Sequence, residues 1–346
     1  MDKLSFTIYV TTRCNMACRY CYEREFAPMA MPLDVAGRTL SFVLDKVSGS
    51  AARHVNIKFH GGEPLLSFPV VRFLMAELEK RAAGGAARFH YSMTTNGTLL
   101  SPDMLPTLGR LDELSVSIDG EEDTHDRNRT FPDRKGTYGM VSGNIKALLA
   151  VCPHVTGRMT LTPHTYETAY AGFLHLLSLG LRKVEMELDF RDPSWTESMI
   201  AGYLEQLKKV ADEVSRRKRA GASLDVPLLG FARGKTRNAV CGGGRSSFVI
   251  APNGEVYPCL MSVSEKRFLL GNVGGQISGE VLAELSKMGR TENPACAGCA
   301  RYDYCRSARC KLINYLCTGD YLMPNPVLCA EERLSVAVGS YFADLA

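Results

Sequence analysis

The chain has 346 residues, of which 45% are hydrophobic, and its formal net charge is +4. This length suits one large domain, or one domain with a smaller appendage, and the apolar fraction is ample for a globular core. No apolar run is long enough to span a bilayer, and the first residues lack the charged and then apolar pattern of a signal peptide. We therefore expect a cytoplasmic protein without a membrane or nucleic-acid partner.

Strand and helix patterns alternate from the start of the chain to about residue 220. Apolar, β-rich runs predict strands at residues 4–10, 55–60, 88–94, 114–118, 157–162 and 183–188. Apolar residues at helical spacing predict helices at residues 33–47, 69–81, 102–108, 138–149, 169–179 and 195–219. These strand–helix units predict an α/β fold with a parallel sheet and right-handed crossovers, closed or nearly closed into a barrel.

Polar loops follow four of the predicted strands. Loops at the carboxyl ends of parallel strands share one face of a barrel, and that face carries the active site. The topology therefore brings together the residues 11–22, which hold three cysteines, the run His60-Gly61-Gly62-Glu63-Pro64, the run Thr95-Asn96-Gly97 and the pair Asp119-Gly120.

The composition changes near residue 230. From there the chain is rich in Gly, Cys and Pro and poor in long periodic helices. A small segment with little core of its own needs staples, and metal clusters can serve. We place the boundary within residues 220–235 and predict a core domain at residues 1–225 and a small cysteine-rich domain at residues 226–346.

The twelve cysteines are unevenly distributed, with three at residues 14–21, one at residue 152 and eight at residues 241–329. In a cytosolic protein they indicate metal or cluster ligation more than disulfides. Cys14, Cys18 and Cys21 have the spacing C-x3-C-x2-C, which can hold three corners of a cubane iron–sulfur cluster and leaves the fourth iron open. A structural zinc site would need a fourth ligand nearby, and an odd number of thiols at this spacing does not pair cleanly.

Gly61-Gly62-Glu63-Pro64 follows the second predicted strand. Two glycines let the backbone approach a ligand closely, and the adjacent carboxylate can accept hydrogen bonds from an ammonium group. The alternative is an ordinary strand-to-helix turn.

Together, the cysteine triplet with an aromatic residue before its last member, the Gly61–Pro64 run and Ser117-Ile118-Asp119-Gly120 resemble the radical S-adenosylmethionine (SAM) superfamily. The resemblance implies a partial (β/α)6 TIM-like barrel and a 4Fe-4S cluster held by Cys14, Cys18 and Cys21. It also implies that SAM chelates the open iron and is cleaved to a 5′-deoxyadenosyl radical, which abstracts a hydrogen atom from the substrate.

The resemblance also assigns the SAM contacts residue by residue. Gly61, Gly62 and Glu63 would hold the amino group, and Ser117 and Asp119 match the position that binds the ribose hydroxyls. The remaining assignments are Tyr20 beside the adenine, Arg129 on the carboxylate, for which a planar guanidinium is suited, and Asn96, for which a role as a turn residue is an equal alternative.

The tail cysteines resemble the SPASM extension, which usually holds two auxiliary 4Fe-4S clusters. By that resemblance the outer cluster takes Cys296, Cys299, Cys305 and Cys329, and the inner cluster takes Cys241, Cys259 and Cys310. Two positions depart from the pattern. Four residues rather than three separate Cys305 from Cys310, and Ser247 stands where some family members have a further ligand of the inner cluster, six residues after Cys241. The inner cluster then keeps an open iron for the substrate or for Cys317, which could equally be a core thiol. Zinc sites are the alternative for the tail, and Cys152 is expected to be a buried thiol.

The leading hypothesis is an enzyme that modifies a residue of a ribosomally made precursor peptide, forming a thioether or carbon–carbon crosslink or an epimer, with a flavodoxin-type reductase as electron donor. The second is a radical SAM dehydrogenase acting on a small molecule or on a protein Ser or Cys. Anaerobic sulfatase maturases carry a catalytic Asp directly after the second tail cysteine. This chain has Leu260 at that position, and we therefore regard formylglycine formation as less favoured. The third hypothesis is a non-catalytic iron–sulfur or zinc protein. The sequence leaves the substrate, the catalytic acid or base and the oligomeric state open.

Overall fold

The computed structural model describes residues 2–82, 85–230, 241–305 and 309–345. Within these residues, one sheet of nine strands has the order β6-β5-β4-β3-β2-β1-β7-β8-β9. The strands are β1 (Lys3–Thr11), β2 (His54–Gly61), β3 (Arg88–Thr95), β4 (Glu113–Ser117), β5 (Thr156–Leu161), β6 (Lys183–Leu188), β7 (Ser247–Ile250), β8 (Glu255–Tyr257) and β9 (Gly271–Asn272).

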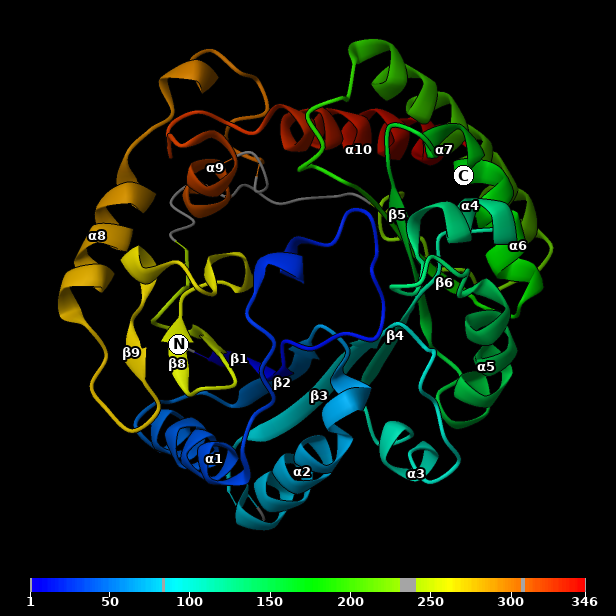
Figure 1. The fold of residues 1–346 in the computed structure, drawn as a ribbon. Coiled ribbons are helices and arrows are strands. Elements are labelled where there is room, and N and C mark those ends of the chain that lie inside the picture. Colours follow the sequence, from blue (N-terminus) through cyan, green and yellow to red (C-terminus); the bar gives the residue numbers. More distant parts are fainter. Residues whose placement is uncertain (1, 83–84, 231–240, 306–308, 346) are drawn as a thin grey trace.

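All neighbouring strands from β6 to β7 pair in parallel. Their helices form a ring outside the sheet (Figure 1). They are α1 (Leu33–Ser48), α2 (Phe68–Ala82), α3 (Leu105–Leu108), α4 (Glu122–Asn128), α5 (Tyr138–Val151), α6 (Ala169–Ser178) and α7 (Glu197–Arg219). The predicted α/β topology is confirmed, and because β6 and β9 remain as two edges, the barrel is partial.

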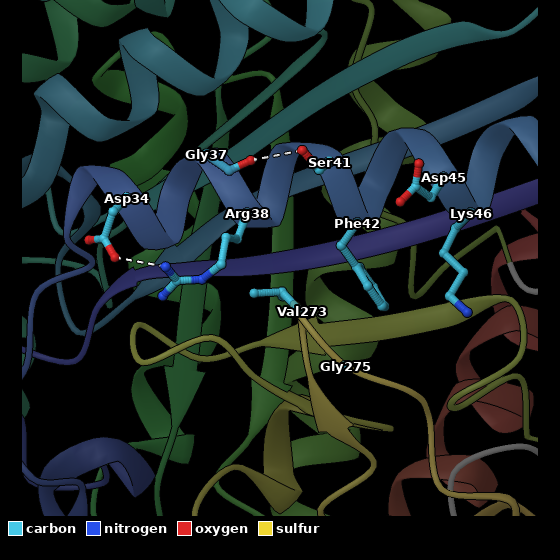
Figure 2. A pocket seen from close by; sticks show the side chains of 10 residues that line it. Asp34, Gly37, Arg38, Ser41, Phe42, Asp45, Lys46, Val273 and Gly275 are labelled. Carbon is cyan, nitrogen blue, oxygen red and sulfur yellow. Dashed lines mark hydrogen bonds and ion pairs between the residues drawn. The ribbon is translucent and has the colours of Figure 1, made fainter.

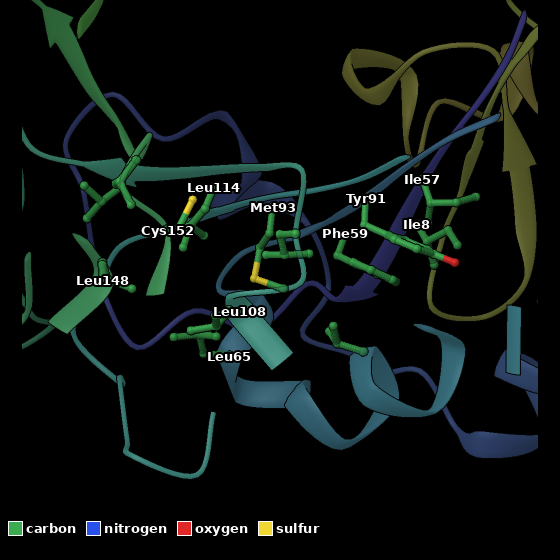
Figure 3. Close-up of a cluster of buried hydrophobic side chains, with 14 of the residues drawn as sticks. Ile8, Ile57, Phe59, Leu65, Tyr91, Met93, Leu108, Leu114, Leu148 and Cys152 are labelled. Carbon is green, nitrogen blue, oxygen red and sulfur yellow. The ribbon is translucent and has the colours of Figure 1, made fainter. Parts of the chain in front are cut away.

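The core lies between the sheet and the helix ring. In β2, Val55, Ile57 and Phe59 are fully buried, while the residues between them are only partly buried. Figure 3 shows the resulting cluster, in which strand residues pack with Leu65, Leu108 and Leu148. Cys152 lies in this cluster and is 7% exposed, so the expectation of a buried thiol is confirmed.

Helix α4 was not predicted. Its seven residues include no aliphatic or aromatic side chain, so the sequence carries no helical periodicity there. The helix is held by the burial of Thr124, His125 and Asn128, and it carries the chain from Asp119-Gly120 to Arg129.

The tail continues the sheet of the barrel. β7 pairs in parallel with β1, and the stacked rings of Phe6 and Phe248 lie 5.4 Å apart. β8 and β9 extend the sheet in antiparallel fashion. Residues 231–240, which include part of the expected boundary, lie outside the described residues. The domain boundary at residue 225 therefore stays a prediction. The strands on both sides of it belong to one sheet.

The tail also contains more helix than its sequence indicates, namely α8 (Gly279–Arg290), α9 (Lys311–Thr318) and α10 (Pro326–Asp344). The 19-residue α10 packs against α7, where Tyr341 Oη donates to Asp212 Oδ1 at 2.8 Å. The expectation of a tail poor in long helices is wrong. The apolar stripe of α10 is interrupted by Ala, Ser and Gly, so its periodicity is weak in the sequence. The helix is stabilised by its contact with α7.

A second contact joins the tail to the first helix of the barrel. Residues 273–275, which follow β9, lie beside α1 and close a pocket of about 630 Å³ with Asp34, Arg38, Phe42 and Lys46 (Figure 2). Among the described residues, we find no helix that combines the length and the apolarity needed to cross a membrane.

Candidate active site

The cysteine loop follows β1 and lies inside the ring of elements in Figure 1, where it is drawn in dark blue. Its two ends are tied together, because the amide of Thr12 donates to the carbonyl of Met29 at 2.8 Å. Its middle is tied to the segment after α4, with the amide of Ala17 2.7 Å from the carbonyl of Thr130. Backbone hydrogen bonds therefore fix the loop at the barrel mouth.

The three cysteines of this loop influence one another. Burial raises the pKa of Cys14 to about 12 and that of Cys18 to about 11, and neighbouring thiols add to both shifts. Burial also raises the pKa of Cys21. Iron binding deprotonates such thiols, because the cation stabilises the thiolate. These three thiols are therefore suited to binding the irons of a cluster, and unsuited to existing as free thiolates.

Asn96 lies beside Cys14. Its Nδ2 is 3.9 Å from Cys14 Sγ and 2.9 Å from Asn15 Oδ1. Its Oδ1 accepts hydrogen bonds from the amide and the hydroxyl of Thr98. Asn15 and Thr98 were not singled out in the sequence, because single polar residues in loops carry no spacing signal.

Gly61 and Gly62 press against the base of the cysteine loop. Gly61 has φ +142°, and a Cβ there would lie 2.0 Å from the carbonyl oxygen of Thr11. A Cβ on Gly62 would lie 2.4 Å from the carbonyl oxygen of Arg13. The glycines are required for this backbone contact, whatever ligand they also approach.

Glu63 is buried, and its carboxylate accepts three hydrogen bonds. Oε1 accepts from the amide of Leu65 and the hydroxyl of Thr95, and Oε2 accepts from the amide of Asn96 at 2.7 Å. Burial raises the pKa of Glu63 to about 7, against the effect of these donors. A cationic group at the mouth would favour the ionised form.

The buried Asp119 and Arg129 form one group with the partly buried Tyr20. Arg129 Nη2 lies 3.0 Å from Asp119 Oδ1, and Tyr20 Oη donates to Asp119 Oδ2 at 2.8 Å. The guanidinium lies over the Tyr20 ring, 5.2 Å from its centroid. Burial opposes the charge of Arg129, but the ion pair with Asp119 outweighs it and raises the pKa. The ribose, adenine and carboxylate contacts expected of these residues stay predictions, since all three are engaged with one another.

Asp119 is also held by the backbone, because Oδ1 accepts from the amide of Thr160 at 2.9 Å. The Asp119 amide in turn donates to Nδ1 of His125, a residue that burial keeps neutral by lowering its pKa to about 4. Ser117 ends β4 and is partly buried. The barrel thus brings the predicted residues of β2, β3 and β4 to one mouth.

The tail cysteines fall into two neighbourhoods. Burial raises the pKa of Cys259 to about 12, with added repulsion from Cys310 and Cys241. Burial likewise raises the pKa of Cys296, with added repulsion from Cys299 and Cys329. Members of both groups line a cavity of about 1080 Å³, namely Cys241, Cys296, Cys305 and Cys310. Of the four residues between Cys305 and Cys310, residues 306–308 lie outside the described part of the chain.

In the described ranges, no three His, Cys, Asp or Glu side chains gather closely enough to hold a single metal ion. This criterion applies to one ion, whereas the ligands of a cubane cluster bind separate irons.

Known families account for both cysteine regions. The profile of the radical SAM superfamily matches residues 8–176, and that of the SPASM iron–sulfur cluster-binding domain matches residues 241–307. The chain belongs to the radical SAM superfamily. It is a radical SAM enzyme with a SPASM domain, and Cys310, Cys329 and α10 lie beyond the matched part of that domain.

Three relatives extend this likeness over most of the chain. The cysteine-type anaerobic sulfatase-maturating enzyme of Clostridium novyi (strain NT) is 24% identical over 89% of this chain and 88% of the relative. The structure of native anSMEcpe with bound AdoMet and Kp18Cys peptide has a TM-score of 0.79 at 20% identity, covering 99% and 98% of the two chains. Streptococcus suis SuiB bound to precursor peptide SuiA has a TM-score of 0.64 at 16% identity, covering 94% and 76%.

Proposed function

We propose that this radical SAM/SPASM enzyme modifies one residue of a peptide. The observation that carries the proposal is the single mouth at which the loop of Cys14, Cys18 and Cys21 meets Glu63, Asp119 and Arg129. Bound SAM and its cluster would supply hydrogen-atom abstraction from an unactivated carbon. The chain's own residues orient SAM, exclude water and deliver the substrate.

The residues fit this cofactor set. Cys14, Cys18 and Cys21 would hold the first cluster, and Asn96 would donate toward Cys14. Glu63 would accept from the SAM amino group, since its buried carboxylate has lone pairs left beside its three donors. The two tail groups support two further clusters, on Cys241, Cys259 and Cys310 and on Cys296, Cys299, Cys305 and Cys329, which makes three in all.

Two substrate classes compete. Modification of a ribosomally made precursor peptide is supported by the likeness to SuiB, which was solved with its precursor peptide. Oxidation of a Cys or Ser in a protein is supported by the sulfatase-maturating relatives. Leu260 follows Cys259 and cannot accept a proton, so we favour the first class. A flavodoxin-type reductase would deliver the electron.

The test is an anaerobic incubation of the reconstituted protein with SAM and dithionite, with and without Kp18Cys peptide. We expect 5′-deoxyadenosine in both, and its absence would remove the enzyme class altogether. In the peptide, a lost thiol with two hydrogens fewer indicates a crosslink, whereas an aldehyde indicates the maturase-like oxidation. A peptide that stays unchanged counts against cysteine oxidation.

A further inference from the structure

The end of β2 and the residues after Cys21 bring together a histidine and a carboxylate to which no role has yet been assigned. His60 Nε2 lies 3.0 Å from Glu23 Oε1, and the two side chains are 14% and 6% exposed. Tyr22 Oη lies 3.2 Å from the same nitrogen. The Tyr9 ring packs against the imidazole with 4.8 Å between centroids. These four side chains form a compact titratable group.

The group stands at the barrel mouth. His60 belongs to the partly buried set of β2, with Asn56 and Lys58, which alternates with the residues packed on the helices. It directly precedes Gly61, and Glu23 follows Cys21 by two residues. His60 therefore lies beside the residues that follow the cysteine loop and directly before the glycines expected to hold SAM.

Two atoms of the pair lack hydrogen-bond partners. His60 Nδ1 and Glu23 Oε2 are both buried and unpartnered. Buried polar atoms are nearly always satisfied, and exceptions gather where a ligand, a water or a proton is handled. The pair is therefore incompletely satisfied without a substrate.

The other acidic groups of the mouth have partners or roles already assigned to them. Asp119 is bound by Arg129 and Tyr20, and Glu63 accepts three hydrogen bonds. Leu260, after Cys259, offers no proton acceptor. His60 differs from them, because its imidazole is held by a carboxylate on one nitrogen and has no hydrogen-bond partner on the other.

We propose that His60, held by Glu23, accepts the proton that the substrate loses; this inference rests on the proposed function. A proton reaching Nδ1, the ring nitrogen without a hydrogen-bond partner, forms an imidazolium whose Nε2–H the Glu23 carboxylate holds at 3.0 Å.

The atoms balance for a thioether crosslink and for the oxidation of a Cys or Ser. The carbon loses one hydrogen atom to the SAM-derived group, and the heteroatom loses its proton to His60. The remaining electron goes to a one-electron oxidant, for which an oxidised iron–sulfur cluster of the tail is the class of group available. The product is a new carbon–heteroatom bond in a crosslink, or a carbon–heteroatom double bond in an oxidation.

Several charged and titratable groups face His60. Glu23 and Tyr22 approach from the residues after Cys21, and Tyr9 approaches from β1. Lys58 lies two residues before His60 on the same face of β2. Burial and Arg158 lower the pKa of Lys58, against the effect of Glu187, Glu185 and Glu23. Among these groups, Glu23 is the carboxylate in direct contact with the imidazole.

The experiment compares the cluster-loaded wild type with His60→Gln, Glu23→Gln and the control His54→Gln, which changes an exposed histidine at the opposite end of β2. Each variant is incubated with SAM, dithionite and Kp18Cys peptide. In His60→Gln we expect 5′-deoxyadenosine and SAM affinity within about twofold of the wild type, and at least about 100-fold less product per 5′-deoxyadenosine. His54→Gln should match the wild type.

Equal product from His60→Gln and the wild type overturns the proposal. So does loss of SAM cleavage or of SAM affinity in His60→Gln, because His60 would then serve the radical source instead. If the wild type forms 5′-deoxyadenosine but leaves the peptide unchanged, the substrate class in the proposed function is wrong. The 5′-deoxyadenosine distinguishes this outcome from a failure of the radical chemistry.

In that case the ring ¹⁵N NMR signals of His60 in the oxidised, cluster-loaded protein decide. A neutral ring with its hydrogen on Nδ1 overturns the proposal, because Nδ1 could then accept no proton. A hydrogen on Nε2 in the wild type that is redistributed in Glu23→Gln, where the carboxylate is gone, supports it.

Discussion

The two cysteine regions of this protein are built differently. The loop of Cys14, Cys18 and Cys21 is fixed by backbone hydrogen bonds to residues beyond it, including Met29 and Thr130. The tail cysteines surround a cavity of about 1080 Å³, and the apolar cluster beneath them has only three buried members. The backbone of the barrel therefore fixes its cysteine loop in advance, whereas we expect the cysteine-rich stretch of the tail to depend on bound clusters for its stability.

The largest expected effect is on catalysis at the first region. Replacing Cys14, Cys18 and Cys21 by Ala should abolish SAM cleavage and remove about four irons per protein, because the three proposed ligands of the first cluster are lost. The thermal unfolding of the barrel should change little, since the loop is held by its backbone. Iron and 5′-deoxyadenosine assays with differential scanning calorimetry check this, and unfolding of the barrel would contradict the contrast.

The second expected effect is on the tail. Removing iron with a chelator should make residues 296–318 accessible to protease while the barrel stays resistant, because this cysteine-rich stretch packs on a cluster of only three buried residues. Limited proteolysis with mass spectrometry locates the cuts. Cleavage spread evenly over both regions would show that they respond to metal in the same way.

The third effect concerns the joint between the regions. Phe248→Ala removes a fully buried ring that stacks on Phe6, and we expect a loss of about 3–5 kcal/mol in the free energy of unfolding. If the pairing of β7 with β1 couples the unfolding of the barrel and the tail, weakening it should separate the two. Calorimetry should then resolve one transition for each region in the variant. The exposed Leu33, replaced by Ala, is the control and should cost far less.

The smallest effect is the pH response of Glu63. Its pKa in the folded chain, about 7, lies above that of an unfolded carboxyl group, so the unfolded state binds fewer protons between about pH 4.5 and pH 7. Stability should therefore fall as the pH rises through this window, by roughly 3 kcal/mol. In Glu63→Gln this fall should vanish. Urea unfolding of the cluster-free protein at several pH values tests it, with the exposed Glu265→Gln as control.

Most of the fold and the position of both cysteine regions could be predicted from the sequence alone. Hydrophobic periodicity identified the six barrel strands, because burial between sheet and helices leaves continuous apolar patterns. Cysteine spacing identified both cluster regions, because several ligands from one short segment must be close in space. The polar loops after the strands followed from topology, since parallel strands end on one face.

Tertiary structure decided what depends on partners distant in the chain. Helix α4 and the long α10 form through burial against other elements, which local periodicity does not reveal. Gly61 and Gly62 owe their lack of side chains to the carbonyls of Thr11 and Arg13, and Asp119 meets Arg129 only after α4 turns the chain. The pairing of His60 with Glu23, 37 positions apart in the printed sequence, likewise arises only when β2 ends beside the cysteine loop.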